Sequence, residues 1–217
     1  MNPYDNVLKP AESGETPAKK RIRSAMLQML EESGPDQIEV KVLCRLARTA
    51  RSTFYLYYSN TEDVMKDMAN VLVKNLTELV HCHNLINRDF VARIWDCLSS
   101  DKETIRIAAL RHRNTAYIER LKLGIQYLLW ERLFYSCSEP HPEAQLVTEM
   151  ASSSLLQAFF YDLEPAGAAA AGSLPPDEEE GAAVSGRETI TGMLDMLDSR
   201  LYRTTIRCRV LKTGVPV

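Results

Sequence analysis

The segment from Arg51 to Tyr58 concentrates groups that could bind nucleic acid. It reads RSTFYLYY and interleaves a guanidinium, two aliphatic hydroxyls and three phenols with apolar side chains. A guanidinium can donate two parallel hydrogen bonds to O6 and N7 of guanine, and hydroxyl groups can donate to phosphate oxygens. These groups could therefore contact nucleic acid, although a Thr-Phe-Tyr run in a helix usually packs in a core.

The charge of the chain is unevenly distributed. The 217 residues have a formal net charge of −3, whereas residues 17–58 carry eight basic side chains against four acidic ones. A basic N-terminal segment on an acidic body is the pattern expected of a phosphate-binding surface. A solvated basic helix face would give the same pattern, so charge alone does not decide the matter.

Three short helices are predicted to position these groups. Thr16-Pro17 is a helix start, because a hydroxyl cap precedes a proline, and Gly34-Pro35 ends that helix. A second helix fits residues 40–47, and a third fits residues 51–58 with Phe54 and Tyr58 on one side. Two helices joined by a tight turn form a helix-turn-helix, whose second helix can enter the major groove.

The rest of the chain is predicted to be helical as well, which gives an all-α fold. A fourth helix begins near Thr61, which we expect to cap it, and ends near residues 81–84. We expect residues 1–15 to be a disordered tail, residues 16–60 the helix-turn-helix domain, and residues 61–217 a helical regulatory and dimerisation domain with a flexible linker at 164–186. Further helices are expected at 88–99, 102–111, 114–135, 143–163 and 187–207.

Several function classes lack their sequence signatures. The five cysteines form no CxxC pair, His81-Cys82-His83 is too closely spaced to ligate one metal ion from a helix, and no apolar run is long enough to span a membrane. No GxSxG, phosphate-binding glycine loop or HExxH motif is present. We therefore expect a cytoplasmic protein with no catalytic residues, no metal, no cofactor and no membrane segment.

The stretch from Val40 to Val64 resembles a known family. Thr53-Phe54-Tyr55, Tyr57-Tyr58, and Asn60 followed by Glu62-Asp63 are similar to the signature of the TetR/AcrR transcriptional regulators, in the same register. The resemblance covers residues 17–65. Beyond them the chain resembles the family only in being helical and of suitable length.

The resemblance implies roles for six residues of this segment. Lys41 would reach DNA from the start of the second helix. Arg51 and Ser52 would lie at the start of the recognition helix, where Arg51 is the best candidate for reading a guanine. Thr53 would touch a phosphate or a thymine methyl. Tyr55 and Tyr57 would bind phosphates through their hydroxyls.

Three positions depart from the family pattern. Arg48 stands at the usual turn glycine, Glu39 at the usual threonine cap of the second helix, and Thr61 at a lysine that normally binds a phosphate. A left-handed conformation would cost an arginine about 1 kcal/mol, so the turn is expected to differ. The departures affect the expected DNA affinity more than the fold.

The resemblance also implies a homodimer and a small-molecule effector. Helices near 143–163 and 187–207 would pair with those of a second copy, although an intramolecular core would explain the same apolar faces. A ligand pocket would use Trp95, Tyr117, Tyr127 and Trp130, with Arg111, His112 and Arg113 as candidate anion partners, although aromatic residues at helical spacing also form ordinary cores.

The sequence thus favours a ligand-responsive repressor that binds a palindromic DNA operator as a dimer. An alternative is a TetR-like coactivator or protein-interaction module without specific operator binding, for which the departures at Arg48, Glu39 and Thr61 are the reason. An enzyme is the third hypothesis, but the sequence offers no convincing pair of a nucleophile and a general base to support it.

Overall fold

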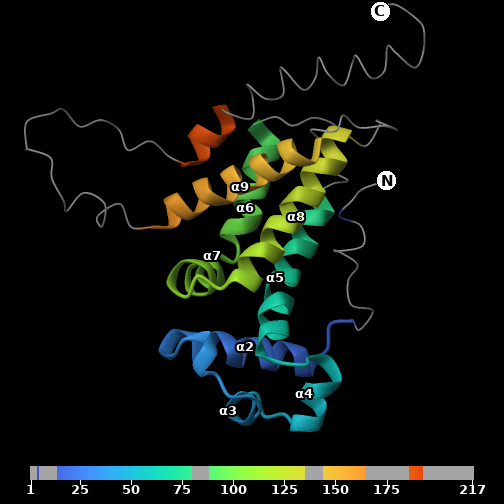
Figure 1. The fold of residues 1–217 in the computed structure, drawn as a ribbon, viewed down its shortest axis with the longest axis vertical. Helices are drawn as coiled ribbons and strands as arrows, with labels where there is room; N and C mark the ends of the chain where they lie inside the picture. The colour runs from blue at the N-terminus through green and yellow to red at the C-terminus, as the bar shows by residue number, and fades with distance from the viewer. Residues whose placement is uncertain (1–3, 5–13, 80–87, 135–143, 165–185, 193–217) are drawn as a thin grey trace, which may run out of the picture. The chain divides into compact units, whose positions relative to one another are not determined.

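The computed structural model describes residues 4, 14–79, 88–134, 144–164 and 186–192 (Figure 1). Every regular element in these residues is a helix, which confirms the all-α fold class. The chain divides into two compact units: residues 1–78 with 97–127, and residues 79–96 with 128–217. None of the described helices is both long enough and apolar enough to cross a membrane.

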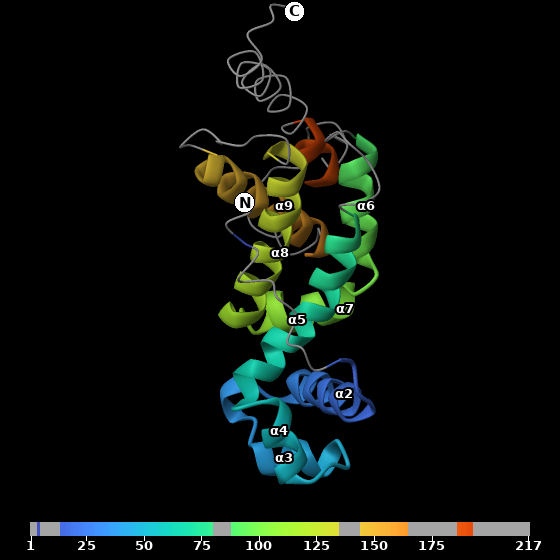
Figure 2. The same cartoon turned by 90° about the vertical axis from the view of Figure 1, so that its right-hand side faces the viewer.

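The first unit holds the three short helices predicted from the sequence and the helix that follows them. Its elements are α2 (Pro17–Glu32), the 3-10 turn η1 (Pro35–Gln37), α3 (Val40–Leu46), α4 (Arg51–Tyr57), α5 (Thr61–Glu78), α7 (Lys102–Ile105), the π-helix η3 (Arg106–Arg111) and the first part of α8 (Thr115–Phe134). In both views α3 and α4 lie side by side next to α2 (Figures 1 and 2). The predicted helix-turn-helix is therefore present.

Local hydrogen bonds explain where α2 and α5 begin. The Thr16 hydroxyl accepts a hydrogen bond from the Lys19 backbone N–H at 3.3 Å, which confirms the predicted cap before Pro17. At α5 the cap is Asn60 rather than the predicted Thr61. The Asn60 side-chain oxygen accepts from the Asp63 N–H at 2.9 Å, while the Asp63 carboxylate accepts from the Ser59 N–H at 3.0 Å.

The core of the first unit is apolar and closely packed. Ile22, Met26 and Leu30 of α2 are fully buried, at a spacing that places them on one helix face. Gly124 of α8 lies so close to α5 that a Cβ atom there would stand 2.7 Å from a methyl group of Val73. A side chain at residue 124 would therefore push α8 away from α5.

The second unit contains most of α6 (Arg88–Ser99), the end of α8 from residue 128, α9 (Ala144–Leu163) and a helical segment at 186–192. Trp95 of α6 meets Phe159 of α9 edge to face, with ring centroids 5.2 Å apart. The Asp162 carboxylate accepts hydrogen bonds from the backbone N–H groups of Gly186 and Arg187 at 2.6 and 3.3 Å. A charged cap thus holds the start of the last described helix against α9.

The turn between α3 and α4 uses a left-handed arginine. Arg48 has φ +50°, and the N–H groups of Arg48 and Thr49 donate to the carbonyls of Arg45 and Cys44 at 3.2 and 2.9 Å. This pair of bonds is the Schellman motif, which ordinarily places glycine at the left-handed position. The expected change of turn is therefore wrong: the chain keeps the left-handed turn, and its hydrogen bonds offset the strain at Arg48.

The predicted helices agree with the described ones to within a few residues. The expected helices at 88–99, 102–111, 114–135 and 143–163 correspond to α6, to α7 with η3, to α8 and to α9. Of the expected helix at 187–207 only residues up to 192 are described. Three predicted features lie outside the described residues: the 1–15 tail except residues 4, 14 and 15, the 164–186 linker except its two end residues, and the His81-Cys82-His83 run. The boundary predicted at residue 60 stays a prediction.

Replacing Arg48 by glycine is expected to stabilise the protein. The change relieves the strain of a left-handed L-residue, but glycine also loses more chain entropy on folding. The net effect should raise the free energy of unfolding by about 0.5–1 kcal/mol. A chemical denaturation curve of the full chain measures it. Arg48→Ala is the matched control, because it removes the charge and keeps the Cβ. Equal denaturation curves for the Arg48→Gly and Arg48→Ala variants would contradict the conclusion that the left-handed conformation is strained at residue 48.

Candidate nucleic-acid interface

Helix α4 is seven residues long and depends on its buried face. Phe54 is fully buried and Tyr58, at the C-cap, is 4% exposed. Their ring centroids lie 5.5 Å apart. An isolated helix of this length is unstable in water. These two aromatic residues, predicted to lie on one side of the helix, therefore anchor α4 to the rest of the first unit.

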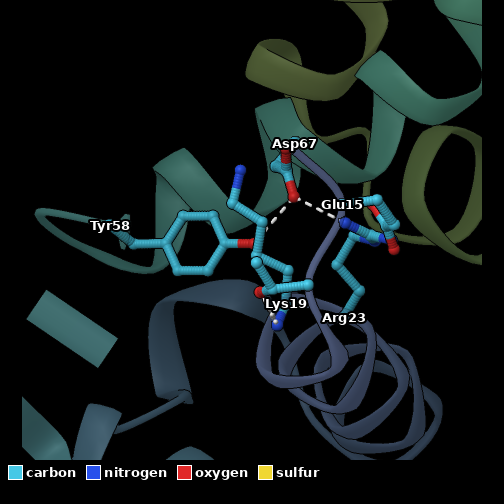
Figure 3. Close-up of polar contacts among 6 residues, drawn as sticks. Glu15, Lys19, Arg23, Tyr58 and Asp67 are labelled. Atoms are coloured by element: carbon cyan, nitrogen blue, oxygen red, sulfur yellow. Dashed lines mark hydrogen bonds and ion pairs between the residues drawn. The ribbon is translucent and has the colours of Figure 1, made fainter. Parts of the chain in front are cut away.

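A polar cluster fixes the C-terminal end of α4 to two other helices (Figure 3). The Tyr58 hydroxyl donates to the Asp67 carboxylate of α5 at 2.7 Å, and the Arg23 guanidinium of α2 donates to the same oxygen at 2.8 Å. Arg23 also pairs with Glu15 at 2.5 Å. Burial and the bond to Asp67 raise the pKa of Tyr58, which keeps its hydroxyl protonated as a donor. We call Arg23, Tyr58 and Asp67 the α4 clamp.

Helix α2 makes two further contacts, one to α4 and one to the end of α3. The ammonium group of the buried Lys19 stands 5.7 Å from the ring centroid of Tyr57, in range of a cation–π contact. The Arg21 side chain donates to the Ala47 carbonyl at 3.2 Å, at the carboxyl end of α3. That bond satisfies one of the carbonyls that a helix end leaves without an intrahelical partner.

The opposite face of α4 is exposed. Arg51 and Ser52 occupy its first two positions and are exposed, and Tyr55 is 53% exposed. Lys41 is exposed at the second position of α3. These four side chains are free of the core and lie on the two helices of the helix-turn-helix.

The remaining two predicted DNA contacts are half-buried. Thr53 and Tyr57 lie on the flank of α4 between its buried and exposed faces, and Tyr57 has the Lys19 ammonium over its ring. The assignment of all six residues to DNA stays a prediction.

Leu56 has no role in the motif recognised in the sequence. This residue of α4 is 78% exposed, more than any other large apolar side chain among the described residues. An apolar residue in a helix is ordinarily assigned to the core. Its position two residues after the buried Phe54, a rotation of about 200°, was the signal that could have placed it outside.

Two departures from the family pattern have visible consequences. Glu39 is the N-cap residue of α3, and its side chain makes no capping hydrogen bond. Thr61, at the first position of α5, is half-buried and extends no charge toward a phosphate. Both differences remove a favourable contribution without altering the path of the chain.

His112 has a structural contact rather than an open ring edge. Its Nε2 lies 2.5 Å from the carbonyl oxygen of Leu30, at the last turns of α2, so the ring N–H donates there. Its neighbours Arg111 and Arg113 are exposed, and Arg113 is left-handed with φ +47°. Of the three candidate anion partners, His112 is thus engaged with α2.

The candidate pocket residues are divided between the two units. Trp95 and Trp130 are buried in the second unit, where Trp95 packs on Phe159. Tyr117 and Tyr127 belong to the first unit; Tyr127 is half-buried, and Tyr117 is fully buried with a hydroxyl that has no hydrogen-bond partner among the described residues. Their assignment to an effector stays a prediction.

Comparison with known proteins shows the fold. No family model matches the chain, and no curated protein sequence matches it. Among solved structures, the fatty acid degradation regulator FadR from Bacillus halodurans is similar at a TM-score of 0.53 and 17% identity, over 85% of this chain and 96% of that one. At this identity the likeness is one of fold.

Two other similar structures have lower scores. A transcriptional regulator of the TetR/AcrR type from Aquifex aeolicus VF5 has a TM-score of 0.47 and 16% identity, over 83% of this chain and 99% of its own. The TetR family repressor AlkX from Dietzia sp. strain DQ12-45-1b has a TM-score of 0.47 and 15% identity, over 85% of this chain and 95% of its own. The fold that the chain shares with FadR agrees with the all-α class predicted from the sequence.

Breaking the α4 clamp is expected to destabilise the protein. Asp67→Asn removes the charge that accepts from both Tyr58 and Arg23, which should lower the free energy of unfolding by about 1.5–3 kcal/mol. Glu62→Gln is the matched control, because it removes an exposed carboxylate that pairs with Lys66 at 2.9 Å on the same helix. That change should cost less than about 0.5 kcal/mol. Equal denaturation midpoints for the two variants would contradict the role of the clamp.

Proposed function

We propose that this chain is a TetR-like DNA-binding transcriptional regulator, a ligand-responsive repressor that binds a palindromic operator as a homodimer. The observation that carries the proposal is the exposed face of α4. Arg51, Ser52 and Tyr55 lie there, opposite a face that Phe54 and Tyr58 bury in the helix-turn-helix. Hydrogen-bond donors on an anchored helix are what reading of base edges requires.

The electrostatics support duplex DNA as the partner. Residues 17–58 carry an excess of basic side chains in a chain whose net charge is negative. Lys41, Arg48 and Arg51 are exposed on α3, on the turn and on α4. A local positive surface attracts the phosphate backbone, while the acidic remainder does not contribute to nonspecific binding.

An exposed apolar stripe on α9 supports dimerisation. Leu146, Met150, Gln157 and Tyr161 are all exposed, and their separations of four and seven residues align them along one side of the helix. Three of the four are large and apolar. A second copy of this helix is the occupant that the dimer proposal assigns to the stripe, with the helix from residue 186 beside it.

The effector part of the proposal is supported by Tyr117. A buried hydroxyl without a partner is unfavourable, and a polar ligand group or a water molecule would satisfy it. We propose Tyr117 as a candidate contact of that effector.

A coactivator without operator binding is the second candidate. The uncapped Glu39, the missing lysine at Thr61 and the exposed Leu46 at 41% favour it. An exposed apolar residue on the helix-turn-helix would suit a protein partner. The absence of any DNA binding at low salt would support this candidate over the repressor.

Substitutions on α3 and α4 are expected to weaken DNA binding. With the DNA upstream of the protein's own gene as the probe, Arg51→Ala should lower affinity about fivefold to 150-fold and relax base preference, because one guanine contact is lost. Tyr55→Phe should lower it less, through one phosphate contact. Lys41→Ala should weaken all duplexes alike and reduce the salt slope by about one. Fluorescence anisotropy measures these constants.

Arg106→Ala is the control for these measurements, because Arg106 is exposed on η3 and pairs with Glu103. It should leave DNA affinity unchanged. If the wild-type chain binds no duplex at low salt, or if the Arg51→Ala variant binds as tightly as the wild type, the assignment of α4 is wrong.

A charge placed on the α9 stripe is expected to separate the dimer. Met150→Glu would bury a carboxylate in an apolar interface, which is strongly unfavourable. Light scattering should give about twice 24.5 kDa for the wild type and 24.5 kDa for the variant. Gln145→Glu adds the same charge to an exposed position on another side of α9 and should stay dimeric. A monomeric wild type at micromolar concentration would overturn the dimer.

A further inference from the structure

Leu56 occupies the centre of the exposed face of α4. Phe54 and Tyr58, one turn apart, define the direction of the core. Ser52 and Leu56, also one turn apart, point in nearly the opposite direction, because two residues correspond to a rotation of about 200°. Arg51 and Tyr55 therefore lie on one flank of the exposed face, and Thr53 and Tyr57 on the other.

If α4 enters a major groove of DNA, its side chains would reach different depths in that groove. The centre of the inserted face approaches the base edges at the groove floor, while its flanks approach the two phosphate backbones. Ser52 and Leu56 then stand over the bases. Thr53, Tyr55 and Tyr57 present hydroxyl groups on the flanks, where the negative charge of DNA lies, and the long side chain of Arg51 can extend from its flank to a base edge. The charge pattern of α4 and α3 fits DNA on this face better than an apolar protein surface.

We infer that Leu56 reads the 5-methyl group of a thymine in the operator half-site. In the major groove the thymine methyl is the apolar group among hydrogen-bond donors and acceptors. Leu56 can make no hydrogen bond, and 78% of it is exposed in the free protein. Contact with a methyl group removes apolar surface from water on both sides, whereas contact with a polar base edge would remove hydration from that edge without replacement.

The inference rests on the proposed function and adds a base preference to it. The guanine assigned to Arg51 and the thymine assigned to Leu56 would lie in the same half-site, since both residues belong to one seven-residue helix. A dimer would present this pair twice.

Replacement of thymine by uracil tests the inference, because it removes only the methyl group. A duplex is first selected by the full-length chain from a pool with randomised centres and is then synthesised with uracil at each thymine in turn. At one thymine of each half-site, uracil should weaken binding about fourfold per half-site, the equivalent of one buried methyl group. The Leu56→Ala variant should bind the thymine and uracil duplexes equally.

Leu46→Ala is the matched control for this experiment. Leu46 is an exposed leucine of the same helix-turn-helix, on α3, where it lines a groove of about 610 Å³ with Met29 and Val42. This variant should keep the wild-type sensitivity to uracil. Because Leu56 is exposed, its truncation leaves the core intact. The uracil replacements are also measured with the wild-type protein, so that part of the test does not depend on the folding of a variant.

Two results would overturn the inference while leaving the proposed function in place. One is a selected duplex in which no thymine responds to uracil. The other is a Leu56→Ala variant that retains the full sensitivity of the wild type. If the pool yields no bound duplex at low salt, both the inference and the proposed function fail.

Discussion

The anchoring of α4 through Phe54 and Tyr58 is the interaction on which the candidate interface depends. A helix of seven residues has too few internal hydrogen bonds to offset the entropy of forming it. Its conformation is therefore a property of the first unit rather than of its own sequence. Every exposed residue of α4 owes its direction to these two buried rings.

The α4 clamp links that anchor to helices on both sides of it in the sequence. Asp67 lies nine residues after Tyr58, and Arg23 lies 44 residues before Asp67. One carboxylate oxygen accepts from both partners, so α2, α4 and α5 are joined at a single atom. A displacement of α5 relative to α2 would change both hydrogen bonds. The α4 clamp therefore helps to fix the orientation of α4 relative to α2 and α5.

The turn before α4 shows how a disfavoured residue can be accommodated. Arg48 adopts the left-handed conformation that glycine would adopt more readily. Two hydrogen bonds to the end of α3 and the Arg21 contact to Ala47 hold the chain in that turn. These hydrogen bonds keep the left-handed turn with an arginine at residue 48.

The sequence by itself determined the helices of the first unit and the residues that anchor them. Thr16-Pro17 placed the start of α2, and the four-residue spacing of Phe54 and Tyr58 placed the buried face of α4, because caps and helical periodicity are local properties. Only the tertiary structure decided that Asp67 meets Tyr58 and Arg23 and that His112 binds the Leu30 carbonyl. These contacts join residues distant in the chain, and local periodicity carries no information about them.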